Sequence, residues 1–193
     1  LDAHIHATLR ALQQEIGSDS FLQILDDVWR SHCDQMKMIR SIFLYLDRTY
    51  ILHSASVRSL WSLGLELFQK HFVGCHLSER SVSGIIDLIK AERHGESVSR
   101  SLIQSLVSML SALDLYSTLF ETPFIESTKA FYKLEGEKKM ASLDIADYLR
   151  HVDRRLQEET DRLNYYLDPA TKRSLMSTVH KQLLFVHIDA ILD

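Results

Sequence analysis

Glycine and proline are scarce in this chain, whose 193 residues include 6 Gly and 2 Pro. A β-sandwich or a doubly wound α/β fold needs a turn roughly every ten residues, and turns depend on these two residue types. So few breakers cannot punctuate that many strands. The scarcity therefore predicts an all-α fold of long helices, and it leaves no glycine-rich loop for a phosphate or a dinucleotide.

Composition and charge place the chain among globular proteins. Hydrophobic residues make up 46% and charged residues 25%, and the formal net charge is -4. A mildly acidic chain has no general attraction to nucleic acid or to anionic lipid, and no apolar run reaches the roughly 18 residues of a membrane span. We therefore expect no direct nucleic-acid partner, no membrane partner and no cofactor. Cys33 and Cys75 lie outside any CxxC pair and are expected to be free thiols.

Apolar residues recur every three or four positions along almost the whole chain, which is typical of amphipathic helices. Cap residues such as Ser99, Asp144 and Asp168 precede several of these patterns. The chain begins without a methionine and ends inside an apolar pattern, so we expect a fragment. The spacing predicts helices over residues 1–16, 21–52, 57–73, 78–93, 99–113, 117–140, 144–167 and 169–193.

The longest pattern, residues 21–52, carries a second apolar line beside its core stripe. Met38, Ile42, Tyr45 and Thr49 are spaced by four, three and four residues. A helix that is apolar on two faces must bury both or present one to a partner. The pattern alone leaves both alternatives open.

Histidines and charged residues are the candidates for a metal site or a catalytic site. Asp2, His4 and His6 resemble a metal motif, but on a helix the two imidazoles point about 200° apart, which argues against a metal site. His32 falls within the apolar stripe and is expected to be a packed core histidine. The charged run from Arg150 to Arg162 has balanced signs, so we expect a solvated helix face with i,i+4 pairs. No catalytic residue is predicted.

Four stretches together resemble the cullin family. Met38–Tyr50 is similar to the family's first-repeat segment, and residues 88–96 (LIKAERHGE) resemble its "IxxERxGE" segment. Residues 124–136 (FIESTKAFYKLEG) resemble "FLxxTxxFYxxEG", and residues 148–159 (YLRHVDRRLQEE) resemble "YLxxVxxRLxEE". Their order and spacing agree over essentially the whole chain, and the first stretch fits the cullin four branch best.

The resemblance implies an all-α, elongated stalk of five-helix cullin repeats, truncated at both ends. Residues 1–53 would be the C-terminal part of repeat one, residues 56–168 repeat two, and residues 169–193 the start of repeat three. In this family the stalk is a non-catalytic scaffold of a multisubunit ubiquitin ligase. It binds a substrate-receptor adaptor and positions the substrate for ubiquitin transfer.

The resemblance also implies which residues bind the adaptor. Tyr45, Arg48 and Thr49 fall on family contact positions, and Ile42 lies one turn before them. For the cullin four branch the implied adaptor is a propeller-type protein of the damaged-DNA-binding complex, which carries WD40-type substrate receptors. The RING subunit would bind only through the family's C-terminal region, and the implied location is nucleus and cytoplasm. Part of the family's adaptor surface belongs to an earlier helix that these residues do not include.

A different class of function would also fit a helical chain without catalytic residues. The alternative is a generic helical-repeat interaction module outside ubiquitin transfer, such as a tethering or complex-assembly subunit. A helical enzyme, the third class, would need a pocket with converging polar groups, and nothing in the sequence predicts one.

Overall fold

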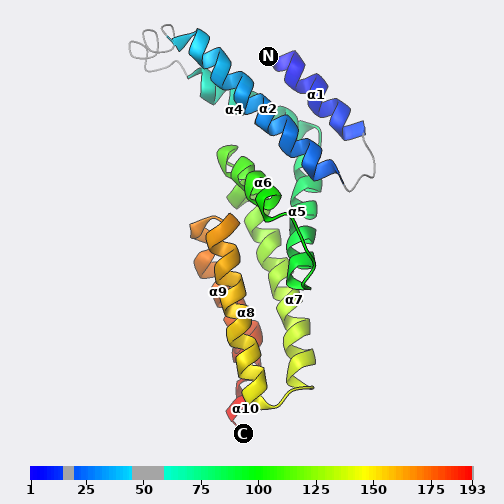
Figure 1. Cartoon of the computed structure of the whole chain (residues 1–193), viewed down its shortest axis with the longest axis vertical. Coiled ribbons are helices and arrows are strands. Elements are labelled where there is room, and N and C mark those ends of the chain that lie inside the picture. Colours follow the sequence, from blue (N-terminus) through cyan, green and yellow to red (C-terminus); the bar gives the residue numbers. More distant parts are fainter. Residues whose placement is uncertain (15–19, 45–58, 193) are drawn as a thin grey trace. The chain divides into compact units, whose positions relative to one another are not determined.

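The computed structural model describes residues 1–14, 20–44 and 59–192, and all regular structure in those ranges is helical. The chain divides into two compact units, one of residues 1–85 with 112–114 and one of residues 86–111 with 115–193. Figure 1 shows their helices coloured along the sequence. The predicted all-α class is confirmed for the described residues.

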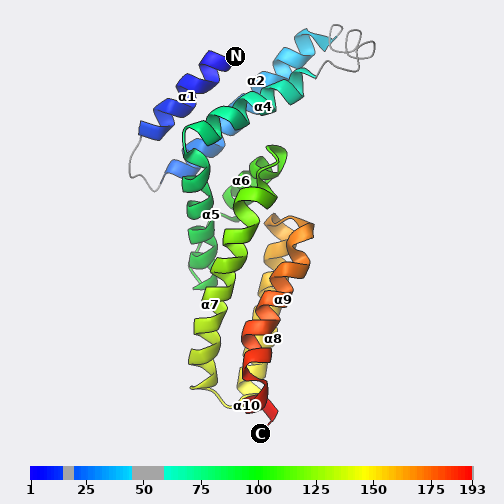
Figure 2. The same cartoon turned by 180° about the vertical axis from the view of Figure 1, so that it is seen from behind.

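The first unit contains α1 (Asp2–Gln14), α2 (Phe21–Ile42), α4 (Leu60–Gly74) and the start of α5 (Leu77–Arg93). α1, α2 and α4 pack against one another, and they lie side by side in both views (Figures 1 and 2). Their shared core is mostly apolar. Among its members, Leu9, Leu25, Phe68 and Phe72 are each at most 1% exposed.

α2 ends earlier than the apolar spacing predicts. Its core stripe is confirmed at Phe21, Leu25 and Met36, which are all buried. The helix ends at Ile42, with Phe43 as its C-cap, instead of running on to about Leu52. Residues 45–58 lie outside the described residues. The apolar period was a poor guide to the helix end because it continues through a C-cap that carries no Gly or Pro.

The second unit contains the end of α5, α6 (Arg100–Ala112), a π-helix (Tyr116–Glu121), α7 (Thr122–Met140) and α8 (Ile145–Tyr166). A 3-10 turn (Pro169–Thr171) then leads into α9 (Lys172–Leu183). α7, α8 and α9 pack together and run in alternating directions (Figures 1 and 2). The last helix was predicted to reach the chain end, but α9 stops at Leu183. A 3-10 turn (Phe185–His187) and α10 (Ile188–Leu192) follow it.

Helix ends in the second unit use the caps that the sequence indicates. The side chains of Ser99, Asp144 and Asp168 accept hydrogen bonds from backbone N–H groups two or three residues further on, at 3.3, 2.7 and 2.8 Å. After α5, Gly95 adopts a φ of 88°, which closes the helix by turning the chain left-handed. These local signals are independent of tertiary packing, which is why the sequence alone reveals them.

Candidate functional site

The described part of the predicted adaptor-binding site is exposed to solvent. The Ile42 side chain is 69% exposed, and Met38, one turn earlier on the same line, is 65% exposed. Tyr45, Arg48 and Thr49 lie outside the described residues. Of the two alternatives for the second apolar line, the described members thus favour a face that is open to solvent.

Two more large apolar side chains are exposed at the end of α2. Phe43 is 48% exposed and Leu44 is 39% exposed. We call Met38, Ile42, Phe43 and Leu44 together the α2 tip. An exposed group of large apolar residues on a folded protein is typical of a protein-binding surface.

The line of Met38 and Ile42 continues toward the N-terminal half of α2, beside a pocket. The pocket has a volume of about 260 Å³, lies between α1 and α2, and includes Leu9 and Phe68 in its lining. Among the α2 residues that line it, Ile24, Val28, Ser31 and Gln35 step by three or four residues toward Met38 and Ile42. The face of α2 that is exposed at Met38 and Ile42 is therefore the face that borders α1 and the pocket further toward the N-terminus.

The N-terminal histidines point in different directions, as the helical spacing predicts. His6 lies 5.0 Å from His71 between ring centroids, and Asp2 Oδ1 lies 2.7 Å from His71 Nε2. His4 instead lines the α1–α2 pocket. Within the described ranges, no group of three or more His, Cys, Asp or Glu side chains is arranged to hold a metal ion.

His32 is a core histidine, as the sequence predicts. Its side chain is buried, and its Nε2 lies 3.2 Å from the carbonyl oxygen of Gly64 on α4. Burial lowers the pKa of His32, so the ring is neutral at pH 7 and donates this hydrogen bond. The histidine therefore fixes α2 to α4 and contributes no reactive group.

The charged run on α8 forms a solvated face only in part. Arg150, Arg154 and Asp161 are exposed, and Arg154 pairs with Glu158 four residues on, as the balanced signs predict. Glu159 and Arg162, however, are 0% and 3% exposed, because they belong to the buried side of α8. For these two residues the expectation was wrong, since a count of charges treats every charged residue as outward-facing.

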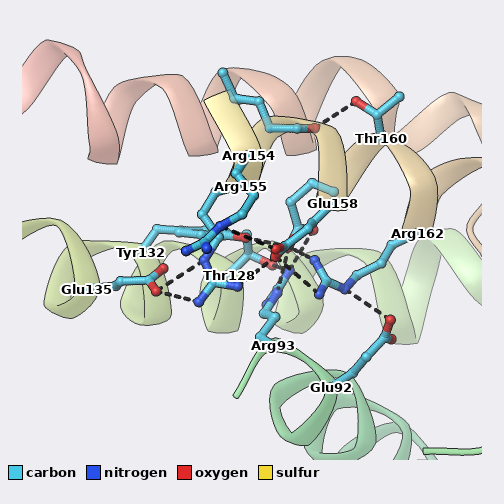
Figure 3. Close-up of polar contacts among 12 residues, drawn as sticks. Glu92, Arg93, Thr128, Tyr132, Glu135, Arg154, Arg155, Glu158, Thr160 and Arg162 are labelled. Carbon is cyan, nitrogen blue, oxygen red and sulfur yellow. Dashed lines mark hydrogen bonds and ion pairs between the residues drawn. The ribbon is translucent and has the colours of Figure 1, made fainter. Parts of the chain in front are cut away.

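The partner of Glu159 is Arg93, at the C-terminal end of α5. Arg93 donates from Nε to Oε1 at 2.9 Å and from Nη2 to Oε2 at 3.0 Å. Tyr132 and Arg162 donate to the same Oε1 at 2.5 and 2.8 Å, and Arg93 Nη2 also reaches Thr128 Oγ1 at 2.9 Å. Figure 3 shows these contacts joining α5, α7 and α8. We call Arg93, Thr128, Tyr132, Glu159 and Arg162 the Arg93 cluster.

Electrostatics keep the central pair of this cluster ionised. Burial alone would raise the pKa of Glu159, but the charges of Arg93 and Arg162, with the hydrogen bonds from Arg93 and Tyr132, lower it below its usual value. The pKa of Arg93 is raised, because Glu159 outweighs the effect of burial. Burial, and then the charge of Glu159, raises the pKa of Tyr132, so the phenol remains a donor. The carboxylate thus accepts four hydrogen bonds, three at Oε1 and one at Oε2, which hold it as an ionised acceptor.

Two further ion pairs flank the cluster. On one side Glu92 accepts from Arg100 Nε at 2.8 Å and from the Tyr166 hydroxyl at 2.9 Å, and Arg162 Nε lies 3.5 Å away. On the other side Arg155 donates to Glu135 from Nε at 3.1 Å and from Nη2 at 2.5 Å. The polar network therefore spans α5, the start of α6, α7 and α8. Figure 3 shows its members on α5, α7 and α8.

Three of the family-like stretches meet in this network. Glu92 and Arg93 come from residues 88–96, Thr128, Tyr132 and Glu135 from residues 124–136, and Arg155 and Glu159 from residues 148–159. The three stretches are visible in the sequence, but the contacts between them were not predicted. A carboxylate in the middle of an apolar stripe was the available signal, since such a group is buried only when it is paired.

Among the helices that the structure describes, none is by itself both long and apolar enough to cross a membrane. The bent pair of Arg100–Ala112 and Tyr116–Met140 meets that test jointly, by length and composition only.

Comparison with known proteins gives one consistent family. The model of the cullin alpha solenoid domain matches residues 1–193. The chain is 44% identical to Cullin-4A of Mus musculus over 98% of its own length, and 41% identical to Cullin-4 of Dictyostelium discoideum over 100%. Identity to Cullin-3A of Arabidopsis thaliana is 32% over 99% of the chain. These figures confirm the predicted likeness to the cullin four branch.

The chain spans about a quarter of the length of these curated relatives, namely 25% of the mouse Cullin-4A, 24% of the Dictyostelium discoideum Cullin-4 and 26% of the Arabidopsis thaliana Cullin-3A. The match covers every helix described above, including both the α2 tip and the Arg93 cluster. The chain therefore belongs to the cullin family and has the family's helical solenoid domain.

Proposed function

We propose that this chain is the adaptor-binding stalk of a cullin-RING ubiquitin ligase scaffold. Membership of the cullin family supports the scaffold role. The observation that carries the proposal is the exposed α2 tip, since Met38 and Ile42 lie 65% and 69% exposed on the line that continues to Tyr45 and Thr49. In this role the stalk holds substrate near the ubiquitin-conjugating machinery and contributes no catalytic residue.

Rate enhancement then comes from position alone. A scaffold that fixes two partners on one rigid body turns an encounter between them into an event at high effective concentration. The adaptor would cover Ile42, Tyr45 and Thr49 as an apolar contact, and Arg48 would supply a charge-assisted hydrogen bond at its edge. We propose a propeller-type adaptor of the damaged-DNA-binding complex with WD40-type receptors, acting in nucleus and cytoplasm. The RING subunit would join through the family's C-terminal region.

Binding to the adaptor tests this proposal directly. Full-length protein carrying Tyr45→Ala with Arg48→Glu is compared with wild type in a pull-down with the purified propeller-type adaptor. Ile42→Glu is the second test variant, because it places a charge on a side chain that the structure shows to be exposed. We expect both variants to lose adaptor capture while their far-ultraviolet circular dichroism stays unchanged.

A matched control comes from α4 of the same unit. Val73 is also a large exposed apolar residue, at 42%. It lies near the end of α4, whereas the α4 residue that touches the C-terminal half of α2, beside Met36, is Gly64 near the start of the helix. Val73→Glu should keep adaptor capture at the wild-type level. Retained capture by the Tyr45 and Arg48 variant would refute the assigned site, and equal loss in the Val73 variant would show that any added charge disturbs the unit.

A further inference from the structure

The second unit contains a buried ion pair, Arg93 with Glu159, that has no part in the proposed adaptor binding. The Arg93 and Glu159 side chains are 1% and 0% exposed, and they join residues 66 positions apart in the chain. Buried ion pairs seldom add net stability over a well-packed apolar core, because desolvation offsets their attraction. Their best-attested use is to select one alignment of helices over its neighbours.

The apolar pattern of α8 leaves its alignment against α7 and α5 underdetermined. A slip of four residues, about 6 Å along the helix axis, moves Tyr148 to the place of Val152 and Val152 to the place of Leu156. Both exchanges keep an apolar side chain on the core side of α8, so the apolar pattern by itself does not exclude the slipped alignment, and polar contacts must select the native one. One such contact, from the Tyr148 hydroxyl to the Leu183 carbonyl at 2.6 Å, fixes α8 to α9.

Glu159 breaks this near-equivalence. A slip of four residues places Leu163 or Arg155 opposite Arg93 instead of a carboxylate. The guanidinium would then be buried without an anion, surrounded by the rings of Phe124 and Tyr132 with its Cζ 5.5 and 5.4 Å from their centroids. Such an unpaired buried charge is strongly unfavourable, so the slipped alignment is rejected.

We propose that the Arg93 cluster is a register lock, which fixes the axial alignment of α8 against α5 and α7. Three elements supply its parts, so that α8 cannot shift against either neighbour without breaking a charged contact (Figure 3). The Thr128 hydroxyl completes the lock by accepting from Arg93 and donating to the Phe124 carbonyl at 2.8 Å. The proposal does not depend on adaptor binding and holds for the second unit alone.

Distance measurement between spin labels tests the lock. Labels go on cysteines at two exposed positions, Lys133→Cys on α7 and Asp153→Cys on α8, in a background of Cys33→Ser with Cys75→Ala. The apolar variant removes the three charged side chains and the Tyr132 hydroxyl together, through Arg93→Met, Tyr132→Phe, Glu159→Leu and Arg162→Met. Glu92 keeps Arg100 and the Tyr166 hydroxyl as partners in this variant.

We expect wild type to give one narrow label distance. The apolar variant should stay helical by circular dichroism but give a broad or double distribution, with a population displaced by several ångström. The control, Lys90→Gln with Asp87→Asn, removes a surface pair of 3.1 Å on α5 and should keep the native distance. An apolar variant that is folded and shows only the native label distance would contradict the proposed lock. An apolar variant that is unfolded would also contradict it, because the ion pairs would then supply stability instead of register.

A second variant tests the lock by moving the carboxylate of Glu159 to another position on α8. Glu159→Leu combined with Leu163→Glu shifts the carboxylate four residues along α8. A register lock predicts that α8 follows it, so that the label distance changes by several ångström as the new carboxylate meets Arg93. An unchanged label distance would contradict the proposal.

Discussion

The Arg93 guanidinium and the Glu159 carboxylate form a two-point hydrogen-bonded pair, at 2.9 and 3.0 Å, that is closed to solvent. Parallel N–H···O bonds of this kind fix direction as well as distance, which an exposed lysine pair does not do. The end of α5 is therefore held to the middle of α8 in one orientation. Removing one partner and removing both should have very different consequences.

Glu159→Leu alone should destabilise the second unit by about 3–5 kcal/mol, because it leaves Arg93 charged and buried. Arg93→Met combined with Glu159→Leu should cost clearly less than the two single changes added together. Urea unfolding of the four proteins measures this coupling. For comparison, Lys37→Gln should leave the urea midpoint almost unchanged, since its 2.9 Å pair with Asp34 is exposed. Additive single and double changes at Arg93 and Glu159 would contradict the pairing.

The fold was predictable from the sequence because its signals are local. Helix periods, caps and breakers act over a few residues, and they located most helix starts, including those after Ser99 and Asp144. The Arg93 cluster was not predictable in the same way. Its members are separated by up to 69 positions, and a helical period cannot show whether a charge such as Glu159 meets a partner.

The sequence predicted only part of the candidate site. The second apolar line was visible from spacing alone, but spacing could not decide whether a neighbouring helix covers it, which is a matter of tertiary packing. The structure answers this for Met38 and Ile42. The adaptor contacts at Tyr45, Arg48 and Thr49 came from family resemblance and stay a prediction.

His151 should make the second unit sensitive to acid. Its ring is buried, its Nδ1 accepts from Arg154 Nη2 at 2.9 Å, and its Nε2 lies 3.6 Å from Glu135 Oε1. Burial lowers the pKa of His151; Arg155, Arg154 and Lys139 lower it further, and only Glu135 opposes them. The unfolded ring binds a proton more readily than the folded ring, so its contribution is complete above about pH 6.5 and is lost as the pH falls below that value.

Urea unfolding at pH 7.5 and pH 5.5 measures this effect. Wild type should lose more stability on acidification than His151→Gln, which keeps a polar side chain but cannot titrate. Because His32 is also buried with a lowered pKa, both proteins retain an acid response from the first unit, and the comparison isolates His151. An identical loss in both proteins would show that His151 does not titrate in this range.

Gly136→Ala should destabilise the packing of α7 on α9. A methyl group at this position would lie 3.2 Å from the backbone oxygen of Gln182 and 3.0 Å from His187 Nε2. Backbone cannot move aside cheaply, so we expect a loss of about 1–3 kcal/mol despite the gain in helix propensity of about 1 kcal/mol. Gly74→Ala is the matched control, because nothing lies within 4 Å of the added methyl group there. Thermal unfolding should show a lower midpoint for Gly136→Ala than for wild type. The midpoint of Gly74→Ala should not fall.

Met38→Asp should weaken adaptor binding even though Met38 is not among the adaptor contacts that the family resemblance implies. Met38 lies one turn before Ile42 on the open side of α2 and is 65% exposed, so its contribution to the core is small. A flexible thioether suits an apolar contact with a partner, whereas a carboxylate there would be desolvated without a counter-charge. We expect at least a tenfold rise in Kd by titration calorimetry in the full-length protein, with an unchanged unfolding midpoint. Met38→Leu should bind almost as wild type does, and wild-type affinity in Met38→Asp would place the edge of the adaptor contact between Met38 and Ile42.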